Sequence, residues 1–222
     1  MRELRAHGVA AVAHVRPDNP RIAEWEARFQ AHYAVTDTTP WELHALRESL
    51  QTWQPTHVFA LLGTTRRRVR AARERGAAES YETVDYGLSA LLLKALLLTG
   101  HQARFIYLSS FGVSAQTRNP YLRARLRMET ELQQSGIPYV IARPLFITGS
   151  DREEARFMER TAGVLTDGLL GLAGALGGGK LRDRYASITG AQLGRALVKA
   201  ALDQRYTNVV LDAAELRHLA RA

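Results

Sequence analysis

A tyrosine and an arginine four positions apart, Tyr121 and Arg125, are the residues of this sequence best suited to proton chemistry. Pro120 before them and Gly136 after them predict a helix that ends at about Gln134. Residues four apart lie one turn apart on the same helix face, and a cation there would prepare the phenol for proton transfer. The alternative is that Tyr121 is an aromatic residue of a helix face at the edge of a sheet.

Further polar and turn-forming residues follow segments that predict buried strands. Ser109 and Ser110 follow the apolar run RFIYL, which ends at Leu108, and no apolar reason explains two serines there. The group Leu62, Gly63 and Thr64 ends the run THVFALL, and Pro144 follows the strand predicted over 139–142. Ligands of open parallel sheets bind beyond the carboxyl ends of the strands. Gly63 would let the backbone approach a ligand closely, although a simple turn would explain it as well.

Strands and helices alternate along most of the chain. Short strands are predicted at Val9–Val15, Tyr33–Val35, Thr56–Leu62, Arg104–Leu108, Tyr139–Ala142 and Asn208–Leu211, and a helix containing LLLKALLL at Tyr81–Leu98. This alternation predicts an α/β fold with a doubly wound, mostly parallel sheet. We expect one domain, with residues 1–150 forming the sheet region and residues 151–222 a small, helical substrate-side cap that belongs to it.

Four segments, taken in order, resemble the atypical short-chain dehydrogenases/reductases, in particular the NmrA-like group and the Tat-interacting-protein oxidoreductases. These segments are Leu62–Arg66 (LGTTR), Tyr107–Ser110 (YLSS), Tyr121–Arg125 (YLRAR) and Arg143–Gly149 (RPLFITG). The resemblance covers about Val9 to Leu202 and implies a Rossmann-like fold that binds NAD(P), related to epimerases and dehydratases.

The resemblance also implies catalytic roles. Tyr121 would be the general acid and base at the carbonyl or alcohol oxygen of a small substrate, and Ser110 would hydrogen-bond the same oxygen. The nicotinamide of the cofactor would exchange hydride. The family carries lysine where this chain has Arg125, whose planar fork is wider than the compact ammonium that also bonds the cofactor ribose.

Six residues are the expected cofactor ligands: Arg16, Asp37, Leu62, Gly63, Thr64 and Pro144. Arg16 follows the first strand, where Rossmann proteins read the adenosine ribose, and no acidic residue ends that strand. This favours the 2′-phosphate of NADP, with NAD as the alternative. Asp37 resembles the aspartate that contacts adenine in the family, although an aspartate after a strand is also an ordinary turn residue.

A dinucleotide fold normally begins with a strand and a glycine-rich turn that holds the pyrophosphate. Here a helix end at Arg2–His7 leads directly into what resembles the family's second strand, and no glycine precedes Gly8. We therefore expect a domain that is incomplete at its N-terminus. In the strand order 3-2-1-4-5-6, the first strand would lie between the strands at 9–15 and 56–62. The alternative is that these two strands pair directly and that cofactor binds weakly or not at all.

Composition narrows the remaining classes of function. The sequence has no cysteine, and its seven histidines show no ligand spacing, so no metal site is expected. No signal peptide and no run of 18 apolar residues is present, so we expect a cytoplasmic protein without membrane attachment. The formal charge of +8 is compatible with phosphorylated ligands or nucleic acid, and its densest run is at 66–75. That run has no interleaved aromatic residues, which favours a solvated basic face over a nucleic-acid site.

Three functions follow as hypotheses. The first is an NADP-dependent oxidoreductase or isomerase acting on a small substrate. The second is a non-catalytic NADP-binding regulator of the NmrA-like kind, which the arginine at position 125 favours. The third is association with nucleic acid through residues 66–75, which requires an affinity that falls steeply with salt. A homodimer through apolar helices such as 89–98 is open, but those helices are better explained as covers for the sheet.

Overall fold

The computed structural model describes residues 1–148 and 187–221. Its main sheet is parallel and has the strand order β3-β4-β5-β8. The strands are β3 (His57–Ala60), β4 (Arg104–Leu108), β5 (Tyr139–Ala142) and β8 (Val209–Leu211). Two parallel two-stranded sheets accompany it: β1 (Ala11–His14) with β2 (Ala34–Asp37), and β6 (Ile147–Thr148) with β7 (Ile188–Thr189).

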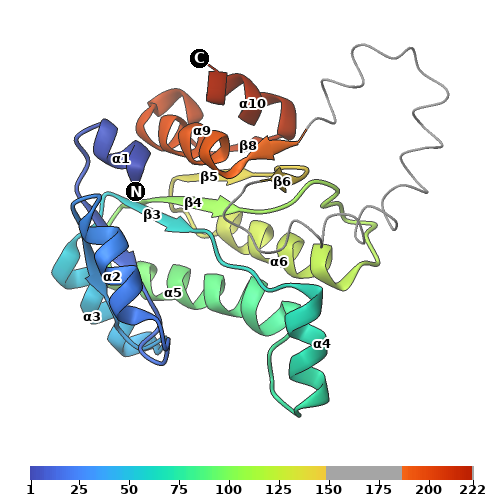
Figure 1. Ribbon diagram of the computed structural model, residues 1–222. Coiled ribbons are helices and arrows are strands. Elements are labelled where there is room, and N and C mark those ends of the chain that lie inside the picture. The colour runs from blue at the N-terminus through green and yellow to red at the C-terminus, as the bar shows by residue number, and fades with distance from the viewer. Residues whose placement is uncertain (149–186, 222) are drawn as a thin grey trace.

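Helices cover both faces of the main sheet (Figure 1). On one face lie α5 (Ser89–Thr99) and α6 (Pro120–Gln134), and on the other α9 (Gly190–Leu202) and α10 (Ala213–Arg221). The remaining helices are α1 (Arg2–Ala6), α2 (Ile22–Gln30), α3 (Leu43–Trp53), α4 (Arg66–Glu74), the π-helix η1 (Tyr81–Leu88) and the short 3₁₀ helix η2 (Gln204–Tyr206). The α/β, doubly wound, parallel fold predicted from the sequence is confirmed.

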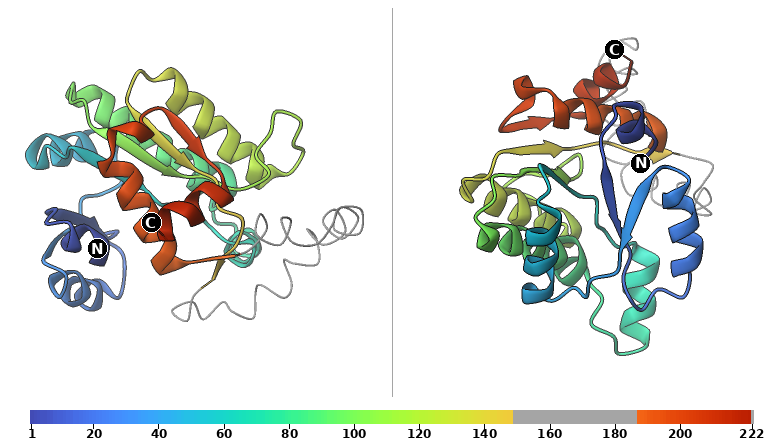
Figure 2. Two further views of the ribbon diagram at one scale, coloured as in Figure 1. Left: turned by 90° about the horizontal axis from the view of Figure 1, so that it is seen from above. Right: turned by 90° about the vertical axis from the view of Figure 1, so that its left-hand side faces the viewer.

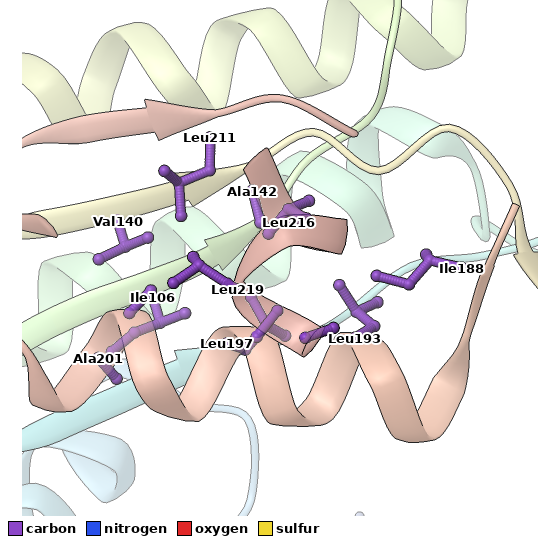
Figure 3. Packing of buried hydrophobic residues seen from close by; sticks show 13 residues of the cluster. Ile106, Val140, Ala142, Ile188, Leu193, Leu197, Ala201, Leu211, Leu216 and Leu219 are labelled. Atoms are coloured by element: carbon purple, nitrogen blue, oxygen red, sulfur yellow. The ribbon is translucent and has the colours of Figure 1, made fainter. Parts of the chain in front are cut away.

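Two apolar clusters, one on each face, hold these layers together. Figure 3 shows the first, in which Leu193 and Leu197 of α9 and Leu216 of α10 pack against Ile106 and Val140 of the sheet. The second places Leu93 and Leu96 of α5 and Met128 and Leu132 of α6 against Phe105. All these side chains are at most 5% exposed. Because the sheet is apolar on both faces, its polar chemistry is confined to the strand ends.

The described part of the expected cap belongs to these layers. β8 extends the main sheet beside β5, and α9 and α10 pack on its face. Near the N-terminus, Glu3 of α1 lies 3.7 Å from Arg195 of α9. The helix expected from about Glu153 and the glycine-rich stretch before Lys180 lie outside the described residues.

The β1–β2 pair stands apart from the main sheet (Figure 2). Among the described residues no hydrogen bond joins β1 to β3, so the alternative that these two strands pair directly does not hold for this part of the chain. The pair is instead joined to the body through α3, which packs against α5.

Residues 81–98, expected as one helix, form two different helices. Tyr81–Leu88 is the π-helix η1, and Ser89–Thr99 is the α-helix α5. Ser80 caps the first with a capping box to Thr83, and Gly100 ends the second at φ 74°. No helix in the described ranges is long and apolar enough to cross a membrane.

Candidate functional site

Arg125 ties together the carboxyl ends of β3 and β4. One terminal nitrogen donates to the carbonyl of Leu108 (2.6 Å), and the other donates to the carbonyl of Leu62 (3.0 Å). The second nitrogen also forms an ion pair with the carboxylate of Asp85 (2.6 Å). Arg125 is 4% exposed and Asp85 is fully buried. The guanidinium is therefore a structural crosslink beneath the site, held by groups of the protein itself.

Burial and neighbouring charges shift the pKa values of Arg125, Asp85 and Tyr107. Burial alone would lower the pKa of Arg125, but the phenols of Tyr121 and Tyr107 and the carboxylate of Asp85 raise it. Burial raises the pKa of Asp85, and the charge of Arg125 opposes that rise. Burial also raises the pKa of Tyr107 to about 12, so this phenol stays neutral at physiological pH. The Nε of Arg125 is buried and has no hydrogen-bond partner among the described residues.

Tyr121 lies in the first turn of α6, where its ring is held from two sides. Asn119 caps the helix by accepting the backbone N–H of Tyr121 at 2.9 Å, and Pro120 occupies the first helical position. The guanidinium carbon of Arg125 lies 5.3 Å from the ring centroid, and the ring of Tyr81 meets it edge-on at 5.4 Å. Tyr121 as a whole is half-buried.

The two serines after β4 have different surroundings. Ser109 is buried and donates a hydrogen bond to the carboxylate of Glu129, which also accepts a hydrogen bond from the guanidinium of Arg143. Ser110 is half-buried at the start of the loop that leads to α6. The structure thus uses Ser109 inside the protein and leaves Ser110 as the serine nearer to solvent, and the catalytic role expected for Ser110 stays a prediction.

Gly63 lies directly over the buried ion pair. A Cβ atom at this position would come within 2.7 Å of Nη2 of Arg125 and 3.2 Å of Oδ1 of Asp85. Thr64 is buried beside it, donating its backbone N–H to Asp85 (3.1 Å) and its hydroxyl to Glu79 (2.5 Å). The glycine therefore lets the turn after β3 close over Arg125, and Thr64 anchors that turn.

A cavity of about 760 Å³ opens between the ends of β1 and β3. It brings together three of the six expected cofactor residues, Arg16, Leu62 and Gly63. Aromatic side chains from the β1–β2 side also line it: His14, Trp25, Phe29 and Trp41. Glu79 and Arg68, an ion pair at 2.8 Å, lie on its wall, and Arg16 is near enough to help lower the pKa of Glu79 against the effect of burial.

The other three expected cofactor residues do not line this cavity. Asp37 accepts hydrogen bonds from the backbone N–H and hydroxyl of Thr39 (3.0 and 2.6 Å) and from Ser49 (2.8 Å), which builds the turn after β2. Pro144 is buried, and its carbonyl accepts the N–H of Phe111 at 2.9 Å. Both hold loops at the strand ends in place. Thr64 faces Glu79 and Asp85, as described above.

The sequence reasoning missed four residues of this region: His14, Trp41, Glu79 and Asp85. The sequence did hold a signal for Asp85, because it is the one acidic residue that follows Glu82 in the mainly apolar helix expected at residues 81–98. Trp41 follows Pro40 at a helix start and gave no sign of where its ring would lie. The basic run at 66–75 lies mainly in α4, where Arg68 pairs with Glu79 and Arg70 with Glu74. No group of three or more potential metal ligands occurs among the described residues.

Comparison with known proteins agrees with this fold. No family model matches the chain. The protein fmp52-1 of Aspergillus terreus, which its name places in mitochondria, is 30% identical over 201 residues, covering 90% of this chain and 79% of that protein. The cytoplasmic location expected from the sequence therefore stays a prediction.

Two solved structures share the fold at low sequence identity. An oxidoreductase of the short-chain dehydrogenase/reductase family from Burkholderia thailandensis has a TM-score of 0.63 at 16% identity, covering 97% of this chain and 86% of that one. A Bacillus halodurans protein assigned as an NAD-dependent epimerase/dehydratase has a TM-score of 0.62 at 16% identity, covering 98% and 91%. The resemblance to short-chain dehydrogenases stated from the sequence is confirmed.

Proposed function

The chain belongs to the family of fmp52-1 and has the fold of the short-chain dehydrogenases/reductases. On this premise we propose that it binds NADP(H) and acts as an oxidoreductase or isomerase on a small carbonyl or alcohol. The observation that supports this best is the cavity between β1 and β3. It collects Arg16, Leu62 and Gly63 after the carboxyl ends of β1 and β3, and ligands of parallel sheets bind at the carboxyl ends of their strands.

The residues present fit the adenosine half of the cofactor. Arg16 is half-exposed at the cavity wall and offers a guanidinium for a 2′-phosphate. Gly63 allows the backbone to approach the ligand, and the aromatic side chains supply apolar faces for a purine. When bound, the nicotinamide half would supply hydride transfer.

The chain's own groups would handle the proton. Tyr121 would hold it at Oη and pass it to or from the substrate oxygen, while the Oγ of Ser110 would orient that oxygen. Arg125 would act from beneath: its charge faces the ring of Tyr121, but its terminal nitrogens are engaged by Asp85, Leu62 and Leu108. It would therefore act on the ring of Tyr121 from beneath, through the cation–π contact, without contacting the cofactor ribose.

That engagement of Arg125 also favours a second candidate, a non-catalytic NADP-binding regulator. A group that bonds two strand-end carbonyls and a buried carboxylate is less free to serve a ligand than a lysine ammonium. In this case cofactor would bind and no substrate would turn over.

One experiment separates the two candidates. NADPH and NADH binding is measured by calorimetry at matched salt, and consumption of NADPH is followed with a panel of small aldehydes and ketones. The proposal expects NADPH to bind more tightly than NADH, with the preference falling on Arg16→Ala. It also expects turnover that falls at least 100-fold in Tyr121→Phe, the usual scale of general acid–base catalysis.

Tyr33→Phe serves as the control, because Tyr33 is 76% exposed and does not line the cavity. Tight NADPH binding without turnover on any substrate class would favour the regulator. Absence of binding to either dinucleotide would refute both candidates.

A further inference from the structure

Trp41 is one of the aromatic residues that line the cavity. It follows Pro40 at the end of the turn after β2 and is half-buried. Its indole lines the cavity between β1 and β3, together with Arg16 and the apolar side chains of Val84 and Leu88 from η1.

The indole is held in place by a chain of hydrogen bonds. Asp37 accepts both the backbone N–H and the hydroxyl of Thr39, and this fixes the turn. The carbonyl of Thr39 accepts a hydrogen bond from Nε2 of His14 at 2.7 Å, and this bond fixes the imidazole at the end of β1. The ring of Trp41 then meets that imidazole edge-to-face, with centroids 5.1 Å apart and planes at 78°. An aromatic ring restrained in this way loses little freedom when a ligand stacks on it.

The chemistry of the cavity selects the kind of ligand that fits. Indole and imidazole rings present flat apolar faces, and Arg16 adds a positive charge at the same wall. A purine that carries a phosphate has the matching features, since its ring can stack and its phosphate can pair with a guanidinium. The carboxylate of Asp37, by contrast, is occupied by Thr39 and Ser49.

We infer that Trp41 determines adenine recognition in this protein, by stacking on the purine of NADP, with Asp37 and His14 as residues that position it. The inference rests on the proposed function, since it assigns a residue to the adenosine half of the same site. It changes the role expected for Asp37, which builds the turn that carries the indole and does not itself read the adenine.

The test is a calorimetric titration of the full chain with NADPH, with 2′-phospho-ADP-ribose as the adenosine half and with nicotinamide mononucleotide as the other half. Trp41→Leu removes the ring, and Trp41→Phe keeps an aromatic face if the leucine variant fails to fold. Trp53→Leu is the matched control, because Trp53 is 43% exposed at the end of α3 and does not line the cavity.

Trp41→Leu should weaken NADPH and 2′-phospho-ADP-ribose by the same factor, roughly 5- to 150-fold, the usual range for a base stacked on an aromatic residue. Trp41→Phe should lose less than Trp41→Leu, and the Trp53 control and the mononucleotide should show no change. NADPH binding that is unaltered in both Trp41 variants would overturn this inference and leave the proposed function standing. Failure of the wild-type chain to bind NADPH would overturn both.

Discussion

At the residue scale, the departure from the family's lysine determines how the site is built. A lysine at position 125 has three donors on one nitrogen, whereas Arg125 spreads its donors over a fork that reaches Leu62, Leu108 and Asp85 at once. The arginine thereby crosslinks two strand ends that a lysine would leave separate. The cost is a buried ion pair, whose value depends on every partner being present.

Asp85→Asn tests that dependence. The substitution removes the negative charge that faces Arg125 and leaves a buried guanidinium without a counter-ion, so we expect a loss of about 3–5 kcal/mol in the free energy of unfolding. Urea denaturation followed by circular dichroism measures it. Glu74→Gln, which breaks the exposed pair with Arg70, should cost no more than about 1 kcal/mol. Equal losses in the two variants would show that the buried pair is no more important than the surface pair.

Gly63→Ala tests the close approach over the same pair. The added methyl group would meet Nη2 of Arg125 at 2.7 Å, and Arg125 cannot withdraw without breaking its bonds to the strand ends. We expect a loss of about 1–3 kcal/mol, the scale of an overpacked interior. Gly194→Ala in α9 has open space around its Cβ and should stabilise the helix by about 0.5–1 kcal/mol. A neutral Gly63→Ala would mean that Arg125 is freer than its contacts indicate.

At the element scale, local patterns predicted most of the sheet and its covering helices. RFIYL forms β4 over the expected residues Arg104–Leu108, and α6 begins at Pro120 and ends at Gln134 as expected. Both were predictable because continuous apolar runs and a proline in the first turn are local signals.

Other features depend on contacts between distant parts of the chain. The π-helix η1 was not predicted, because its winding accompanies contacts with α6: Asp85 to Arg125, and Tyr86 to Glu131 at 2.7 Å. Trp41 was missed for the same reason, since only the turn built by Asp37 brings it to the cavity. The crosslinking role of Arg125 could not be predicted for the same reason. Its partners Leu62 and Leu108 are 46 residues apart in the sequence and come together only at the ends of β3 and β4.

A histidine joins β3 to α9 and makes that contact sensitive to pH. The Nε2 of His57 lies 2.9 Å from the carbonyl of Ala201, and burial lowers the pKa of His57 below its ordinary value of 6.5, with Arg104 contributing to the lowering. The unfolded chain therefore binds this proton more readily, so stability is present above about pH 6.5 and falls as the pH drops below it. Denaturation across pH 5–8 should show this slope, reduced in His57→Gln and unchanged in the exposed-histidine variant His44→Gln. A slope that persists in His57→Gln would assign it to other groups.

At the scale of the whole molecule, the described residues form three sheets, and helix packing joins the β1–β2 sheet to the main sheet. β1 pairs only with β2, whereas β4 lies between two partners and is buried on both faces. Exposed apolar residues on the β1–β2 pair, Val12 at 39% and Val35 at 50%, are opposite each other in the register. The pair is therefore the less protected part of the fold, and it also contributes His14, Arg16 and Trp41 to the cavity.

Amide hydrogen exchange should reveal this division. Local opening is easiest where few buried contacts hold a segment, so we expect peptides that cover β1 and β2 to exchange at least tenfold faster than those covering β4 and β5.

If NADPH binds in the cavity, it contacts the β1–β2 sheet and the main sheet at once, and its free energy of binding adds to the stability of the β1–β2 pair. Protection should then rise over residues 14–19, 37–41 and 61–64 and stay unchanged in α10, which packs on the main sheet away from the cavity. Protection that rose uniformly over the whole chain would indicate global stabilisation alone. A β1–β2 pair that exchanged as slowly as β4 without ligand would show that the helix packing already joins the two sheets into one cooperative unit.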